Sequence, residues 1–286
     1  MTAPTPQPGG SAARAVAHHP AVRPVTFRRM VAGERIKIGS LRSTWWILLL
    51  GTAVVPAFAV SRVISIAGVP EAVGSAGMVG AAYVTGGVAL AQLAFAVLGV
   101  MVVAGEYGSG QIRTTLTVTP TRVRALLAKA VVLVLVVVAA STVAVLAAWA
   151  ASAPWFGATG MSVDLRREED ARLILGTPLY LGAVAALAFG IGLLVRSAAA
   201  GISIVVGLLL VVENLLAAIP WAPLQSLAAH LPSSAGSRLL RSDAVGSVIT
   251  VADGTELSPW GGYGVMLLWV LGVLAVATAL LRRRDA

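Results

Sequence analysis

The chain has no cysteine and only three histidines, and charged residues make up 12% of its 286 positions. The absence of cysteine excludes a disulfide framework and every thiolate-based metal site. The histidines, His18, His19 and His230, stand outside the long apolar blocks, and no H-E-x-x-H pattern occurs. Two adjacent histidines in a polar tail offer too few convergent ligands to hold a metal ion. The sequence therefore predicts no metal site and no cofactor.

A phosphate-binding loop of the form G-x-x-x-x-G-K-[ST] is also missing, so we do not expect this chain to bind ATP in that way. No set of Ser, His and Asp residues gathers on one membrane face, although sequence order alone does not exclude convergence in space. The sequence therefore predicts no catalytic residue, and we expect that the chain is not an enzyme.

Apolar residues, in contrast, are abundant: they make up 58% of the chain, and the mean hydropathy is +0.89. A soluble domain of this length does not have enough interior to hide them. The apolar blocks are continuous over about 20 residues, the length of a membrane-spanning helix. The alternation over about 10 residues that a membrane β-barrel requires is not visible. The sequence predicts an all-α polytopic membrane protein.

Six spans are expected, and a long loop at residues 220–259 precedes the last of them. In this loop, Trp221, Leu224, Leu227 and Leu231 recur at helical spacing. The loop is consistent either with a segment that re-enters the membrane or with a surface loop. The six expected spans cover approximately residues 44–66, 81–104, 125–151, 173–195, 198–219 and 260–281.

Two further segments precede the transmembrane domain, which we place at residues 44–286. Residues 1–24 are rich in Pro, Ala and Gly, which predicts a disordered cytoplasmic tail. Residues 25–43 combine periodic apolar positions with basic residues, which predicts an amphipathic helix in the headgroup plane; a solvated helix is the alternative. The residues expected at this interface are Phe27, Arg28, Arg29, Arg35 and Lys37.

The net charge of +9 is distributed as an orientation signal. If both termini are cytoplasmic, fifteen of the 21 basic residues lie on the inner side and eight of the twelve acids on the outer side. Basic residues accumulate at the cytoplasmic ends of spans. We therefore predict a multi-pass protein of the plasma membrane with both termini inside, and no nucleic-acid partner.

The stretch Gly105–Lys129 is the longest polar interruption on the predicted inner side. Glu106 stands where the second span ends, and Gly108 and Gly110 allow a turn. Residues 111–116 are expected to form a short helix that carries Arg113, and Pro120 is expected to end it. From composition alone, this stretch fits a docking helix and an ordinary basic loop equally well.

The same stretch resembles the signature of type-2 ABC exporter permeases. The residues that carry the resemblance are Glu106, Gly108, Gly110, Leu116, Pro120, Thr121, Arg122 and Lys129. The chain departs from the signature at Thr121, where serine is common. The resemblance implies that this stretch, with Arg113, is a cytoplasmic coupling helix that contacts an ABC ATPase subunit. It also implies that residues 25–43 are the elbow helix of the family.

The function implied by the resemblance is the membrane subunit of an ATP-driven exporter. It would move a hydrophobic or amphipathic substrate out of the cytoplasm when docked to a separate ATPase chain. Six spans make half of such a transporter, so a second copy or a close relative is expected. The alternative is a stand-alone secondary carrier, a membrane-embedded enzyme or an anchor without an ATPase partner. A carrier is expected to show internal repeats and charged relays in several spans, which are not evident here.

Glu213 and Asn214 stand in the fifth span, about two turns from its outer end. An ionisable group at such a depth is costly and tends to face a cavity or a partner. The pair is therefore a possible part of a translocation path. The alternative is a position near the outer interface, where water or a loop satisfies the carboxylate.

Overall fold

The computed structural model describes residues 26–69, 73, 78–108, 122–242 and 257–284. These residues form helices and no strand. Six of the helical segments in this part of the chain are long and apolar enough to cross a membrane. The predicted all-α polytopic fold is thus confirmed. The predicted tail at residues 1–24 and the body of the predicted coupling helix, residues 109–121, lie outside the described residues.

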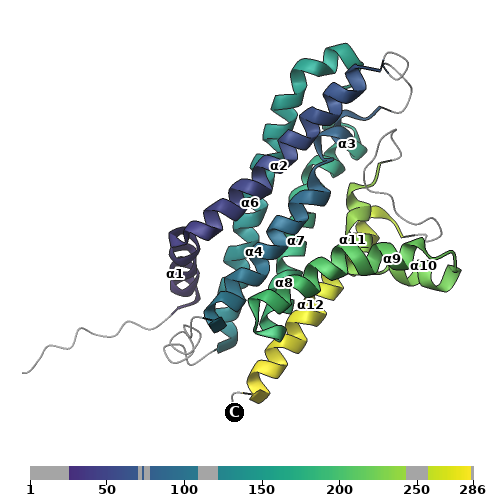
Figure 1. Cartoon of the computed structure of the whole chain (residues 1–286). Coiled ribbons are helices and arrows are strands. Elements are labelled where there is room, and N and C mark those ends of the chain that lie inside the picture. Colours follow the sequence, from purple (N-terminus) through teal and green to yellow (C-terminus); the bar gives the residue numbers. More distant parts are fainter. Residues whose placement is uncertain (1–25, 70–72, 74–77, 109–121, 243–256, 285–286) are drawn as a thin grey trace, which may run out of the picture.

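The described helices follow the predicted spans, with additional short helices between them (Figure 1). The fifth span consists of three consecutive pieces, α8, the π-helix η1 and α9. The elements are α1 (Phe27–Ser40), α2 (Arg42–Ala67), α3 (Gly80–Val84), α4 (Val88–Gly108), α6 (Arg122–Thr159), α7 (Glu168–Val195), α8 (Ala198–Val206), η1 (Gly207–Val212), α9 (Glu213–Ala218), α10 (Ala222–Ala229), α11 (Pro232–Ser237), the 3₁₀ turn η2 (Arg238–Leu240) and α12 (Pro259–Arg284).

Helix α7 is the centre of the bundle and packs against α4, α6, α8 and α12. Of the residues in its most apolar stretch, 78% are buried, against 22% in α2, in the fifth span and in α12. The contact with α4 is close because Gly99 has no side chain. A Cβ atom there would lie 2.4 Å from the carbonyl oxygen of Ala185. The outer helices consequently present apolar side chains outward, as expected in a lipid environment.

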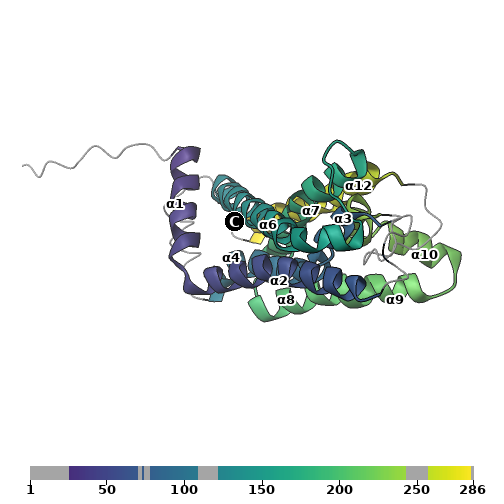
Figure 2. The same ribbon diagram turned by 90° about the horizontal axis from the view of Figure 1, so that it is seen from above.

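Helix α1 lies crosswise to α2, as Figure 2 shows. It contacts α6 and α2, and the end of α4 and the C-terminal end of α12 lie on the same side of the molecule (Figure 1). We call this side the α1 end. The crosswise position follows from Leu41, which is extended (φ −87°, ψ 119°) and separates α1 from α2.

The segment between α9 and α12 is buried inside the bundle where α11 lies. Five of the six residues of α11 are buried, and this short helix contacts α12 and α7. The hydroxyl of Ser233 lies 2.9 Å from that of Tyr180. Tyr180 is twelve residues from the start of α7, about 18 Å along the helix axis. The loop 220–259 therefore contributes a buried helix rather than lying wholly on the surface.

The second span is interrupted, which the sequence did not predict. The turn Thr85–Gly87 separates α3 from α4. A Cβ atom on Gly87 would lie 2.7 Å from the Cα atom of Val55, so α2 passes against the backbone of the turn. Arg62 of α2 donates to the carbonyl of Ala82 at 3.3 Å. The break falls at Gly86 and Gly87, and it accompanies a close contact with α2.

The third and fourth spans are longer than expected. Helix α6 has 38 residues, about 57 Å, which exceeds the roughly 30 Å of a bilayer core. Helix α7 begins within the acidic cluster, with Glu168, Glu169 and Asp170 in its first turn. Acids in the first turn are stabilised by the helix dipole. Glu168, Glu169 and Asp170 lie outside the expected span 173–195, because the hydropathy signal ends before the helix does.

Candidate functional site

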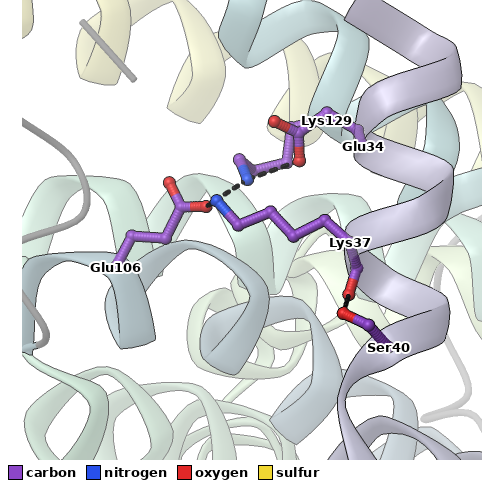
Figure 3. A network of polar contacts seen from close by, with 5 residues as sticks. All are labelled: Glu34, Lys37, Ser40, Glu106 and Lys129. Atoms are coloured by element: carbon purple, nitrogen blue, oxygen red, sulfur yellow. Dashed lines mark hydrogen bonds and ion pairs between the residues drawn. The ribbon is translucent and has the colours of Figure 1, made fainter. Parts of the chain in front are cut away.

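The charged cluster at the α1 end is centred on Lys129 of α6. Its side chain is 2% exposed, and its Nζ atom lies 2.6 Å from Glu34 Oε2 and 2.6 Å from Glu106 Oε1 (Figure 3). Glu34 belongs to α1 and Glu106 to α4. A buried ammonium is tolerated only with paired, hydrogen-bonded partners. Here two carboxylates from two other helices supply them.

Lys37 completes this cluster from α1. Its ammonium also donates to Glu106 Oε1, and its side chain is 32% exposed. Lys37 and Glu34 lie three residues apart, so both project from one face of α1. Two ammonium groups and two carboxylates balance in charge. We refer to Glu34, Lys37, Glu106 and Lys129 as the inner cluster.

The inner cluster joins α1 to both helices that flank residues 109–121. Glu106 stands two residues before the end of α4, and Lys129 stands in the second turn of α6. A displacement of either helix end relative to α1 therefore changes an ion pair. The inner cluster thus connects α1 through ion pairs to the two helices that flank the predicted coupling stretch, residues 109–121.

The sequence named three members of this cluster but did not join them. Lys37 was assigned to the membrane interface, and Glu106 and Lys129 to the signature of the central stretch. Glu34 was missed. Its signal is an acid inside an otherwise basic helix, three residues before a lysine. Its partner Lys129 lies 95 residues away, and sequence spacing does not reveal such a pair.

The other predicted coupling residues are described only in part. Gly110, Arg113, Leu116, Pro120 and Thr121 lie outside the described residues, while Gly108 ends α4 and Arg122 begins α6. The predicted interface residues all belong to α1. Those that are exposed are Phe27, Arg28, Arg29 and Arg35.

A second contact at the α1 end joins the turn between α7 and α8 to α4. Arg196 adopts a left-handed backbone conformation (φ 57°) that ends α7. Its guanidinium lies 5.3 Å from the ring centroid of Tyr107, within range of a cation–π contact. Tyr107 follows Glu106 directly, so two adjacent residues at the end of α4 contact α1 and the turn between α7 and α8.

Glu213 is the centre of a different polar cluster. It is 3% exposed and directly follows the π-helix η1. Its Oε1 atom accepts from the backbone N–H of Ser233 at 2.9 Å. Its Oε2 atom accepts from the backbone N–H and the hydroxyl of Ser234, at 2.6 and 2.7 Å. The carboxylate thus caps the N-terminus of α11, where amide groups lack partners within the helix.

Tyr180 and Gln92 extend this cluster into the bundle. The hydroxyl of Tyr180 donates to Gln92 Oε1 at 2.5 Å and lies 2.9 Å from Ser233 Oγ. These residues connect α7, α4 and α11. We refer to Gln92, Tyr180, Glu213, Ser233 and Ser234 as the outer cluster.

The structure separates the two residues of the predicted path. Glu213 points into the bundle and is bonded to the loop, whereas Asn214 is exposed and donates to the carbonyl of Leu210 at 2.9 Å. They lie on different faces of the fifth span. A role of either residue in translocation stays a prediction.

The turn η2, which follows α11, is held by arginines. Arg172 of α7 donates to the carbonyls of Leu239 and Arg241, at 2.7 and 2.9 Å. Arg238 donates to the carbonyl of Leu257 at 3.1 Å. Desolvation by burial, and secondarily the charge of Arg241, lowers the pKa of Arg238. Glu213 thus binds the start of α11, and Arg172 binds the turn that follows its end.

Within the described residues, no group of three His, Asp or Glu side chains converges as metal ligands do. No protein-family model matches the chain, and no curated protein matches it.

Proposed function

We propose that the chain is the membrane-spanning permease subunit of an ABC exporter. The observation that carries the proposal is the inner cluster, which attaches the crosswise helix α1 to the ends of α4 and α6 on either side of residues 109–121 (Figure 3). A segment held in this way would transmit a push from a partner to three helices at once. This arrangement suits coupling to a separate motor chain.

In the proposed mechanism, two permease copies, or one copy and a close relative, form the path, and two ATPase subunits dock at the α1 end. This end would face the cytoplasm, in keeping with the distribution of basic residues. ATP binding would bring the ATPases together and displace residues 109–121. The helices would then exchange between inward and outward access.

The proposed substrate is hydrophobic or amphipathic, because the spans are strongly apolar. Transport would depend on a difference in substrate affinity between the two states, since a ligand shifts an equilibrium only by its differential affinity. The permease would contribute no catalytic group to ATP hydrolysis.

Purification of the tagged chain from its own cells tests the proposal. A nucleotide-hydrolysing subunit should co-purify, and the complex should hydrolyse ATP faster when an apolar substrate is present. Charge reversal by Arg113→Glu or Arg122→Glu should weaken this association. The exposed Arg166→Glu, on the predicted outer side, is the matched control. Glu106→Lys is unsuitable as a docking test, because a third ammonium beside Lys37 and Lys129 would disrupt folding.

Transport by the reconstituted chain alone would overturn the proposal and favour a stand-alone carrier. Full association and transport in both the Arg113 and Arg122 variants would remove the docking role of residues 109–121.

A further inference from the structure

A cavity of about 390 Å³ lies between α1, α2 and α4. Its volume falls within the range of small-molecule sites. All four residues of the inner cluster line it, together with Thr44. The remaining wall is largely apolar. The apolar side chains are those of Ile38, Leu41, Ile47, Leu98, Met101 and Val102.

The cavity is charged at one end and apolar at the other. Glu106, Met101 and Leu98 stand on successive turns of α4, so eight residues separate the charged end from the deepest apolar wall, about 12 Å. Ser43, Leu41 and Gly105 are exposed, and the cavity opens beside them. An amphiphile with a polar head near α1 and a chain along α4 fits this arrangement.

The charges specify the head of the ligand. The inner cluster presents both an ammonium and a carboxylate to the cavity, so a head that carries both charges meets a partner for each of them. A zwitterion is such a head. Lys37 donates to Glu106, but its side chain is 32% exposed, and its ammonium has further N–H donors to meet a phosphate at the mouth. Lys129 is 2% exposed and bonded to two carboxylates.

Glu34 is placed to meet the positive part of the head. Its Oε2 atom accepts from Lys129. The side chain of Glu34 is 11% exposed, so its Oε1 atom is the oxygen that can accept from a ligand. A primary ammonium offers N–H donors for a charge-assisted hydrogen bond to a carboxylate. A quaternary ammonium offers none. The site therefore favours a phosphoethanolamine head over a phosphocholine head.

We propose that this cavity binds one phospholipid with a phosphoethanolamine headgroup. The phosphate contacts Lys37, the ammonium contacts Glu34, and one acyl chain lies along Leu98 and Met101. Because α1 and α2 both line the cavity, a bound lipid bridges the crosswise helix and the first span. The inference does not rest on the proposed exporter function, since it uses only the cavity and its charges.

Lipid competition on the purified full chain tests the proposal. The chain in detergent is given equal amounts of phosphatidylethanolamine, phosphatidylcholine and phosphatidylglycerol with identical acyl chains, and retained lipid is counted by native mass spectrometry. We expect one retained phosphatidylethanolamine per chain, preferred about tenfold over phosphatidylglycerol, the factor expected from about one charge-assisted hydrogen bond. Equal retention of the three lipids would overturn the proposal without any variant.

Two variants locate the site. Met101→Trp fills the apolar part, and Lys37→Gln removes the phosphate contact, so each should reduce retention about tenfold. Leu135→Trp is the matched control, because Leu135 is 60% exposed on α6 and outside the cavity; it should retain lipid as the unmodified chain does. Undiminished retention in both Met101→Trp and Lys37→Gln would place the lipid elsewhere and overturn the assignment.

Discussion

Glu106 and Glu213 are both buried carboxylates in spanning helices, yet they are satisfied by opposite means. Glu106 accepts from the ammonium groups of Lys37 and Lys129, whereas Glu213 accepts from two backbone amides and one hydroxyl of α11. Cationic side chains neutralise the charge of Glu106. The charge of Glu213 is stabilised by the N-terminus of α11, whose amides favour negative charge. The inner cluster is therefore an attachment shared by several side chains, whereas the carboxylate of Glu213 binds one helix end in a fixed direction.

The two arrangements suit different mechanical roles. An ion pair between flexible side chains keeps part of its attraction when the helices shift, and Lys129 has two carboxylates to exchange between. A cap made of backbone amides holds only while α11 keeps its position. We therefore infer that the inner cluster tolerates small movements of α1, α4 and α6, while the outer cluster fixes α11 against α9.

The largest expected effect comes from Lys129→Met. This substitution leaves Glu34 and Glu106 without their buried cation, and breaking a buried ion pair costs about 3–5 kcal/mol. Chemical unfolding of the detergent-solubilised chain, followed by circular dichroism, measures the loss. Arg124→Met on the same helix is exposed and should change stability by less than about 0.5 kcal/mol.

An addition to this experiment tests the cause. Neutralising Glu34 together with Lys129 leaves the Lys37–Glu106 pair, so the double variant should regain part of the lost stability. A double variant less stable than Lys129→Met would show that charge balance is not what Lys129 provides.

Glu213→Gln should have the next largest effect. The amide nitrogen of glutamine would replace one acceptor oxygen and meet a donor of Ser233 or Ser234, leaving a buried group unsatisfied at a cost of about 1–3 kcal/mol. Hydrogen exchange should accelerate at the α11 amides and not in α1. Glu106→Gln is the comparison, since its exchange should change in α1 instead. Accelerated exchange in α1 of the Glu213 variant would contradict the independence of the two clusters.

Tyr180→Phe should cost less, about 0.5–1.5 kcal/mol, the usual net value of a hydrogen bond. The substitution removes the hydroxyl between Gln92 and Ser233, but Ser233 keeps a contact with Gln92 at 3.4 Å. Unfolding midpoints measure the loss. Tyr263→Phe serves as the control, because its hydroxyl makes an exposed 3.3 Å bond to the carbonyl of Leu179. A loss as large as that of Glu213→Gln would mean that Tyr180, not Glu213, holds α11.

The sequence was sufficient for the spans and for α1, because hydropathy and amphipathic spacing are local signals. It did not predict the break at Thr85–Gly87 or the π-helix η1. The break accompanies a close contact with Val55 of another helix. Helix ends beyond the apolar stretch were missed for a related reason, since residues such as Glu168 carry a loop signal when read alone.

The two clusters were predictable to different degrees. Glu213 drew attention because it is an acid within an apolar span, but its partners Ser233 and Ser234 carry no signal of their own. Glu34 and Lys129 are common residues at helix surfaces, and only their juxtaposition across 95 residues makes them unusual. Burial of such a pair is a property of the packed bundle.

The smallest expected effect is that of Lys37→Met, and it tests whether the inner cluster is redundant. Lys37 is partly exposed, and Glu106 keeps its bond to Lys129 after the change. The expected loss is therefore about 0.2–1 kcal/mol, as for an exposed ion pair. Unfolding under the conditions used for Lys129→Met measures it. A loss equal to that of Lys129→Met would show that the two lysines act as one unit, and that α1 is fixed as rigidly as α11.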